Sequence, residues 1–165
     1  DVSAIESGQL RLRTSEFNLA QLVGKRVRFY QTAAQQKNIR LVIQPTEDCW
    51  VHGDEGRLGQ VIDNLISNAI KYSGNDTEVT LSLSRGQDQV TLSVEDEGVG
   101  IPENEAGRLF NAYSDISSVP TAGESSTGLG LAICKTIVQQ HKGSIGITPG
   151  RNKGCHFFFT VPTAR

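Results

Sequence analysis

Two asparagines and a lysine recur at intervals of about one helical turn in the segment EGRLGQVIDNLISNAIKYS, residues 55–73. At ~100° per residue, Asn64, Asn68 and Lys71 share one arc with Arg57 and Gln60, opposite an apolar arc. A solvated helix face usually carries Glu, Lys and Arg, because Asn is a poor helix former. An Asn oxygen can serve as a neutral ligand for Mg²⁺, and a Lys can face phosphate as a point charge. The stripe therefore indicates either a solvated face or a metal–phosphate site.

Two glycine clusters follow, VEDEGVGIP (94–102) and STGLGLAI (126–133). The spacing matches neither a Walker loop nor a Rossmann fingerprint. The second cluster opens a predicted helix, where free backbone N–H groups can hold phosphate. The carboxylate of Asp96 is then left for a ligand group that donates hydrogen bonds, such as the exocyclic amine of adenine. Gly98 and Gly100 would let the backbone close over the edge of the base.

The pattern of the whole chain predicts the elements that position these residues. Helices are expected from Asn18, which is a candidate N-cap, over about 54–73, and over about 130–141, ending at Gly143. Strands are expected at 39–43 and 49–51, in a hairpin of EVTLSLS and QVTLSVE joined by RGQD, and in closing segments SIGIT and CHFFFTV. Residues 111–127 are typical of a long mobile lid. This order predicts an α+β fold. It would be a two-layer α/β sandwich, with a mixed, mostly antiparallel sheet of about five strands covered on one face by about three helices.

Composition narrows the class of protein. The 165 residues suffice for one domain with a core, and the net charge of −2 gives no reason to expect a nucleic acid or membrane-surface partner. No apolar run approaches the ~20 residues of a membrane span. The three cysteines are odd in number and widely spaced, which favours a reducing compartment. The chain contains no methionine, so we expect it to be part of a longer protein.

Four motifs taken together resemble the catalytic and ATP-binding domain of sensor histidine kinases, which has the Bergerat fold. DNLISNAIKYS resembles the N box, VEDEGVGIP the first glycine box, RLF the start of the F box, and STGLGLAI the second glycine box. The closing segments HKGSIGI and KGCHFFFTVP resemble the last hairpin of that family. The opening DVSAIESGQLRLR resembles the end of a dimerisation helix followed by a linker. The resemblance implies two parts, residues 1–15 as helix end and linker and residues 16–165 as the catalytic domain.

The resemblance also implies a role for each motif residue, with ATP and Mg²⁺ as cofactors. Asn68 would ligate Mg²⁺. Asn64 and Lys71 would be the catalytic residues, ordering and contacting the phosphates. Tyr72 would pack against adenine or ribose, and Asp96 would bind the adenine amine. The full expected nucleotide-binding set is Asn64, Asn68, Lys71, Tyr72, Asp96, Gly98, Gly100, Ile101, Phe110, Thr127, Gly128, Leu129, Gly130 and Leu131.

In that family the γ-phosphoryl group goes to a histidine on the upstream dimerisation domain and then to a response regulator. The partners implied are therefore that domain, which is absent from this chain, and a response regulator. We expect this chain to be monomeric and the full-length protein to be a homodimer. We also expect this chain to be the cytoplasmic portion of a sensor kinase, whether or not that kinase has membrane spans upstream. His52, His141 and His156 lie outside any phosphoacceptor pattern, and structural roles are expected for them.

Several alternatives stay open at this point. RLFNAYSDIS has no cation between Phe110 and the second glycine box, where the family usually has one. This departure favours an alternative function, a nucleotide-binding regulatory or degenerate kinase module with weak or no phosphotransfer. A serine kinase of the anti-sigma-factor type is a third reading, which the helix-like start of the chain disfavours. Asp63 is interpreted as a surface group or as a base, and Trp50 as a core residue.

Overall fold

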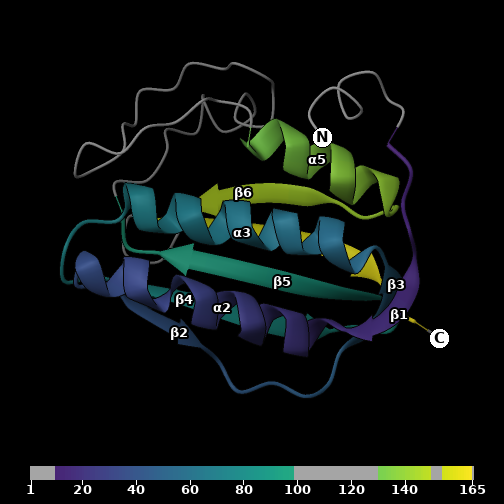
Figure 1. The fold of residues 1–165 in the computed structure, drawn as a ribbon, viewed down its shortest axis with the longest axis horizontal. Coiled ribbons are helices and arrows are strands. Elements are labelled where there is room, and N and C mark those ends of the chain that lie inside the picture. Colours follow the sequence, from purple (N-terminus) through teal and green to yellow (C-terminus); the bar gives the residue numbers. More distant parts are fainter. Residues whose placement is uncertain (1–9, 99–129, 150–153, 165) are drawn as a thin grey trace.

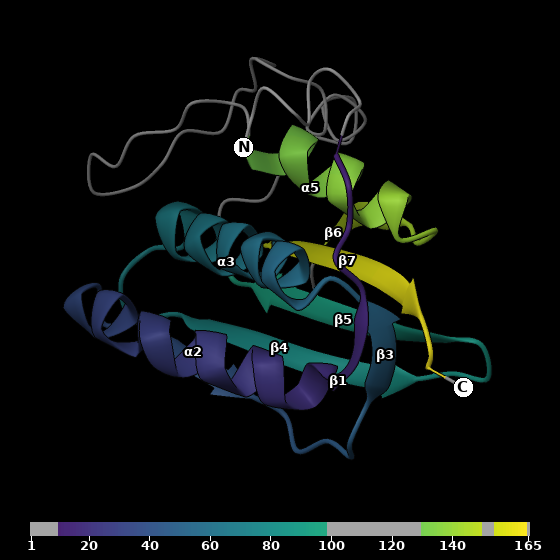
Figure 2. The same cartoon turned by 45° about the vertical axis from the view of Figure 1, so that its right-hand side comes forward.

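A five-stranded mixed sheet is the main layer of the computed structural model, which describes residues 10–98, 130–149 and 154–164. Three helices lie side by side on one face of this sheet in the described part of the chain (Figures 1 and 2). In spatial order the strands are β2 (Arg40–Ile43), β4 (Glu78–Arg85), β5 (Gln89–Asp96), β7 (Cys155–Pro162) and β6 (Ile145–Pro149). The helices are α2 (Leu19–Gln36), α3 (Glu55–Tyr72) and α5 (Gly130–Gln140). The predicted two-layer α+β sandwich is confirmed, and the expected lid lies outside the described residues.

Alternation of apolar and polar residues builds the centre of the sheet. In β5, Val90, Leu92 and Val94 are buried against the helices, while the residues between them face the other side. Strands β4 and β5 pair antiparallel, and Gly86 N donates to Gln89 O at 2.8 Å in the turn between them. The predicted hairpin is therefore confirmed. Strand β2 pairs parallel to β4, and every other ladder of the sheet is antiparallel.

Side chains at the helix starts fix where α2 and α3 begin. Asn18 caps α2, as predicted, because its Oδ1 accepts from Ala20 N at 3.1 Å. Asp54 caps α3, with Oδ1 accepting from Arg57 N at 3.0 Å. Helix α3 runs between α2 and α5 and buries its apolar arc in the common core (Figure 2). No helix within the described ranges is long and apolar enough to cross a membrane.

A second, two-stranded sheet was not expected from the sequence. It pairs β1 (Ser15–Asn18) antiparallel with β3 (Trp50–Gly53), and Thr163 forms a bridge to Val51. Because side chains alternate along β3, Val51 points into the core and Trp50 points outward, 51% exposed. The prediction that Trp50 is a core residue is wrong. The division between residues 15 and 16 stays a prediction, although Leu10 on its N-terminal side is already buried.

His141 is a buried structural residue that joins the end of α5 to the start of α3. Its Nε2 accepts from Asp54 N at 2.9 Å, and its Nδ1 lies 2.8 Å from Ile137 O. The first bond requires an unprotonated Nε2, so the ring is neutral with the proton on Nδ1. Residue 53 must be glycine here, because a Cβ would lie 2.7 Å from the His141 ring. The contacts support the structural role expected for this histidine.

Candidate functional site

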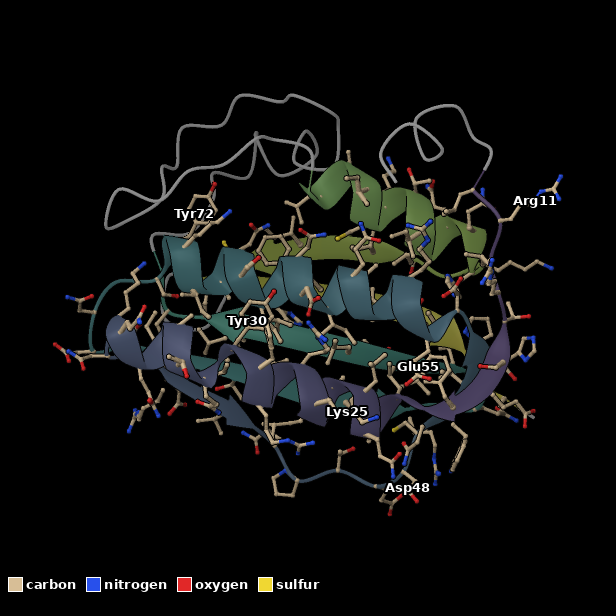
Figure 3. The ribbon with its side chains drawn as sticks, in the orientation of Figure 1. Arg11, Lys25, Tyr30, Asp48, Glu55 and Tyr72 are labelled. Carbon is tan, nitrogen blue, oxygen red and sulfur yellow. The ribbon has the colours of Figure 1, made fainter. Side chains whose placement is uncertain are left out.

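The C-terminal half of α3 presents the predicted phosphate and metal residues. Asn68, Lys71 and Tyr72 are all half-buried there, and Figure 3 shows Tyr72 at the opposite end of α3 from Glu55. The amide of Asn68 makes no hydrogen bond with the described residues, which leaves its oxygen available to a ligand. This end of the helix therefore offers a cation, an aromatic ring and a neutral oxygen donor within two turns.

Asp96 ends β5 as a buried carboxylate, with 3% of the residue exposed. Its Oδ1 accepts from Gly98 N at 2.8 Å and from Cys155 N at 3.2 Å. Burial raises the pKa of the carboxyl above its ordinary value, these two bonds lower it, and the neighbouring Glu95 raises it. Since both bonds use Oδ1, Oδ2 accepts nothing from the described residues. The carboxylate is thus held in one orientation with one oxygen left for a ligand.

Two glycines allow the backbone to approach this carboxylate closely. A Cβ on Gly98 would lie 2.4 Å from Tyr72 O and 3.1 Å from Asp96 Oδ1. A Cβ on Gly154 would lie 1.9 Å from Asp96 O. Any other side chain at either position would force backbone atoms apart. The glycines therefore bring the end of α3 against the end of β5, so that Lys71 and Tyr72 share one site with Asp96.

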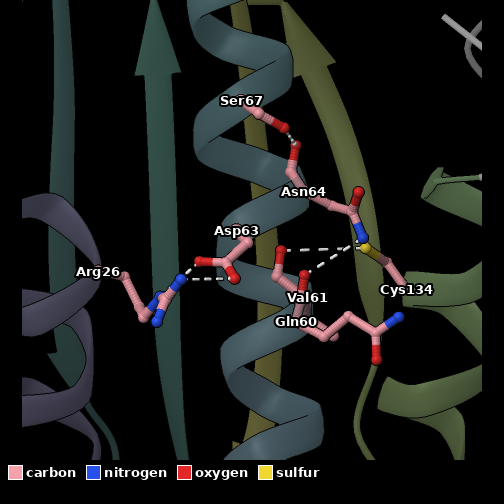
Figure 4. Close-up of polar contacts among 7 residues, drawn as sticks. All are labelled: Arg26, Gln60, Val61, Asp63, Asn64, Ser67 and Cys134. Carbon is pink, nitrogen blue, oxygen red and sulfur yellow. Dashed lines mark hydrogen bonds and ion pairs between the residues drawn. The ribbon is translucent and has the colours of Figure 1, made fainter. Parts of the chain in front are cut away.

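Asn64 lies on the side of α3 that faces α5 (Figure 4). Its Nδ2 donates to Gln60 O at 3.2 Å, and its Oδ1 is 2.9 Å from where a Cβ on Gly130 would be. Gly130 is the first residue of α5, so Asn64 meets the helix start expected to hold phosphate. Cys134 of α5 packs beside this contact, with its Sγ 3.9 Å from Val61 O. Burial raises the pKa of its thiol to about 12, which keeps the thiol protonated and inert.

Asp63 points to the other side of α3, toward α2 (Figure 4). Its two carboxylate oxygens pair with Arg26 Nε at 2.5 Å and Arg26 Nη2 at 2.8 Å. The two side chains are 29% and 30% exposed. This bidentate pair occupies the carboxylate on the face opposite Asn64, so the geometry supports the surface interpretation of Asp63 rather than the interpretation as a base.

Eight of the fourteen predicted nucleotide-binding residues lie in the described part of the chain. Lys71, Tyr72, Asp96 and Gly98 converge where α3 and β5 end, and Asn68 lies one turn before Tyr72 on the same helix. Leu131 is half-buried beside Gly130 at the start of α5 and packs against the core. The structure supplies positions for these residues, and their roles stay predictions. The predicted residues outside the described ranges are Gly100, Ile101, Phe110, Thr127, Gly128 and Leu129.

The donors of the described residues suit Mg²⁺ that arrives together with phosphates. The described ranges contain no group of three or more His, Cys, Asp or Glu side chains that could hold a metal by themselves. Asn68 offers a single neutral oxygen, and Mg²⁺ usually keeps several waters and takes substrate phosphates as ligands. The residues present therefore fit a magnesium ion bound through one amide oxygen, with the nucleotide supplying the remaining charge.

Sequence comparison places these residues in a known context. Residues 53–165 match the family of histidine kinase-, DNA gyrase B- and HSP90-like ATPases. The chain is 35% identical over 161 residues to the adaptive-response sensory kinase SasA of Crocosphaera subtropica, which covers 96% of this chain. It spans only 42% of the length of SasA. The match to the family extends over more than half of the chain and includes every described residue of the candidate site.

Solved structures agree with this match. The catalytic domain of histidine kinase ThkA is 28% identical with a TM-score of 0.81, covering 93% of this chain and 99% of that domain. ThkA in complex with the response regulator TrrA gives a TM-score of 0.80 at 28% identity, over 99% of this chain and 46% of that one. Full-length ShkA in complex with AMPPNP gives 0.82 at 26% identity, over 98% of this chain and 34% of that one. The resemblance drawn from the four motifs is confirmed.

Proposed function

The chain belongs to the family of histidine kinase-, DNA gyrase B- and HSP90-like ATPases, and on that premise we propose that it is the ATP-binding catalytic domain of a sensor histidine kinase. It would bind ATP with Mg²⁺ and donate the γ-phosphoryl group to a histidine on a dimerisation domain. The observation that carries the proposal is the meeting of Asp96 and Gly98 with the C-terminal end of α3. That junction brings the fixed carboxylate of Asp96 to the helix end that carries Lys71 and Tyr72.

The carboxylate of Asp96 is suited to bind the adenine ring of the nucleotide. Asp96 Oδ1 is held by two backbone N–H groups, and Oδ2, which accepts from none of the described residues, can accept from the exocyclic amine of adenine. A guanine would present a carbonyl oxygen at the same place, and two acceptors would then face each other. Tyr72 adds an aromatic surface at the end of α3 for the base or ribose. Recognition of adenine over guanine follows from this arrangement.

The phosphates would lie along the polar side of α3, near the start of α5. Lys71 supplies a positive charge, and the first N–H groups of α5 supply donors and the positive end of a helix dipole. Asn64 meets Gly130 at that helix start and would order the phosphates. Mg²⁺ would be held through Asn68, and it neutralises charge on the phosphates during transfer. The chain itself contributes positioning, which is the main requirement of phosphoryl transfer.

The partners follow from the same proposal. The acceptor would be a histidine outside this chain. His141 is buried in structural bonds, His156 contacts Thr148 at the sheet surface, and the exposed His52 lies in strand β3 rather than on a helix. ThkA has been solved with a response regulator, and we propose a response regulator as the downstream partner here as well. The chain is proposed to work as the monomeric cytoplasmic catalytic part of a homodimeric sensor kinase.

A transfer assay tests the proposal. The chain is mixed with labelled ATP, Mg²⁺ and a separately produced dimerisation domain that carries an exposed histidine. A kinase gives label on that domain that is acid-labile, as expected for phosphohistidine, and an Asn68→Ala variant gives much less. Saturable ATP binding without transfer, even when both domains are joined in one chain, would favour the regulatory alternative that the sequence of residues 108–117 raised.

A further inference from the structure

Lys37 is a buried lysine that reaches from the end of α2 to the end of α3. The residue is 9% exposed and follows directly after Gln36, the last residue of α2. Its Nζ donates to Ile70 O at 2.6 Å and to Lys71 O at 3.1 Å. Lysines are seldom buried without strong polar partners, so this placement calls for a specific reason.

The contacts complete the C-terminal end of α3. The last four carbonyls of a helix have no partner within it and carry the negative end of the helix dipole. Ser73 N donates to Ala69 O at 3.1 Å. Lys37 Nζ donates hydrogen bonds to the next two carbonyls along the chain, those of Ile70 and Lys71. A buried ammonium group therefore caps the C-terminal end of the helix, two and three residues after Asn68, and its positive charge meets the negative end of the helix dipole.

These carbonyls belong to the residues that lead into the candidate site. Lys71 is one of the two residues whose carbonyl Lys37 binds, and Tyr72 follows it. Tyr72 O is the atom that the missing Cβ of Gly98 would approach at 2.4 Å, and Gly98 N in turn donates to Asp96 Oδ1. A chain of direct contacts thus leads from Lys37 through the end of α3 to the carboxylate of Asp96.

We propose that Lys37 is a positioning residue for the nucleotide site, holding the end of α3 in the place where Lys71 and Tyr72 meet a bound adenine nucleotide. Its ammonium group binds backbone carbonyls of α3, so its effect on a nucleotide would pass through that helix. This inference rests on the proposed nucleotide-binding function. Its consequence is that the loss of Lys37 weakens nucleotide binding even in a chain that is fully folded.

Fluorescence anisotropy of a labelled ATP analogue, displaced by unlabelled ATP and by ADP, tests the proposal in the presence of Mg²⁺. Lys37→Met keeps most of the aliphatic stem and removes the ammonium group. Arg26→Met is the matched control, because it also removes a cation that binds α3. Arg26 lies in α2 and pairs with Asp63, on the face of α3 opposite Asn64. Melting curves select a temperature at which each variant is folded.

We expect Lys37→Met to bind ATP and ADP about tenfold more weakly or worse, whereas Arg26→Met stays within about twofold of the wild type. Lys37→Arg, which keeps the charge and the donors, should recover binding to within about threefold. If Lys37→Met binds like Arg26→Met, Lys37 only stabilises the fold and the inference is overturned. If the wild type binds neither nucleotide, the proposed function itself fails. Should Lys37→Met not fold, Lys37→Gln replaces it with the same outcomes.

Discussion

The substitution Asp96→Asn tests the proposed recognition of adenine without removing the hydrogen bonds that hold the site together. An Asn in the same rotamer keeps an oxygen at the position of Oδ1, where it still accepts from Gly98 N and Cys155 N. At the position of Oδ2 it places an NH₂ group, which would face the amine of adenine with donor against donor. The substitution should therefore leave the chain folded and remove the recognition of the base.

The structure sets the size of both effects. A hydrogen bond to a charged group contributes about 1.5–3 kcal/mol, which corresponds to about 10- to 150-fold in affinity. Folding stability should change by less than about 1 kcal/mol, because the two backbone donors keep their acceptor and lose only the added strength of a charged one. The variant also removes the cost of burying a carboxylate that is 3% exposed.

The pH dependence has a defined sign. Burial raises the pKa of Asp96 in the folded chain above its ordinary value of 3.8. A raised folded-state pKa gives a contribution to stability that is present below the ordinary pKa and lost as the pH rises through the raised one. Compared with Asp96→Asn, the wild type should therefore lose stability over that window. Its affinity for ATP should change in the opposite direction, falling as acid protonates the carboxyl.

Equilibrium dialysis with labelled ATP measures the affinity, and urea unfolding measures the stability of the same preparations. The expected result is an unfolding midpoint close to that of the wild type together with a loss of affinity of at least about tenfold. Glu95→Gln, one residue earlier on the same strand, is the control and should bind normally. Normal ATP affinity in a folded Asp96→Asn variant would refute the assignment of this carboxylate to the base.

Two further predictions concern contacts that hold the site in place. His141→Leu leaves the buried Asp54 N–H without its acceptor and removes the bond to Ile137 O, so urea unfolding should show a loss of about 2–4 kcal/mol. The exposed His52, changed to Gln as a control, should stay within about 0.5 kcal/mol, and an equal loss in both would contradict the role of His141. Gly154→Ala places a Cβ 1.9 Å from Asp96 O and should cost about 2–4 kcal/mol as well as nucleotide affinity. The control is Gly74→Ala, which has nothing within 4 Å of the added carbon and should lose little stability. If Gly154→Ala kept the stability and the nucleotide affinity of the wild type, the backbone around Asp96 could move to accept the added carbon.

Local patterns were enough to predict most elements of this fold. Alternation in β4 and β5 and the glycine-containing turn between them indicated the hairpin. The 3.6-residue period and the cap at Asn18 indicated α2, and the apolar arc of α3 indicated which face would be buried. These signals are carried by neighbouring residues, so they can be interpreted without knowing the rest of the chain.

Features that depend on distant segments were not predictable in the same way. Nothing in SEFN or WVHG indicates that the two segments pair as β1 and β3, and the outward position of Trp50 follows only from that pairing. The role of Lys37 depends on where the end of α3 lies, and a lysine after a helix is ordinarily a surface residue. The motif residues themselves were found from sequence, whereas the contacts that orient Asp96 and Asn64 required the structure.

Calorimetric titration with ATP, with and without Mg²⁺, tests the central claim most directly. The wild-type chain should bind one ATP, more tightly when Mg²⁺ is present. Asn68→Ala should still bind ATP and should lose the gain that Mg²⁺ provides, because its amide oxygen is the proposed protein ligand. An absence of ATP binding in the wild type would contradict the account. An undiminished Mg²⁺ effect in Asn68→Ala would contradict the assignment of the metal to the polar face of α3.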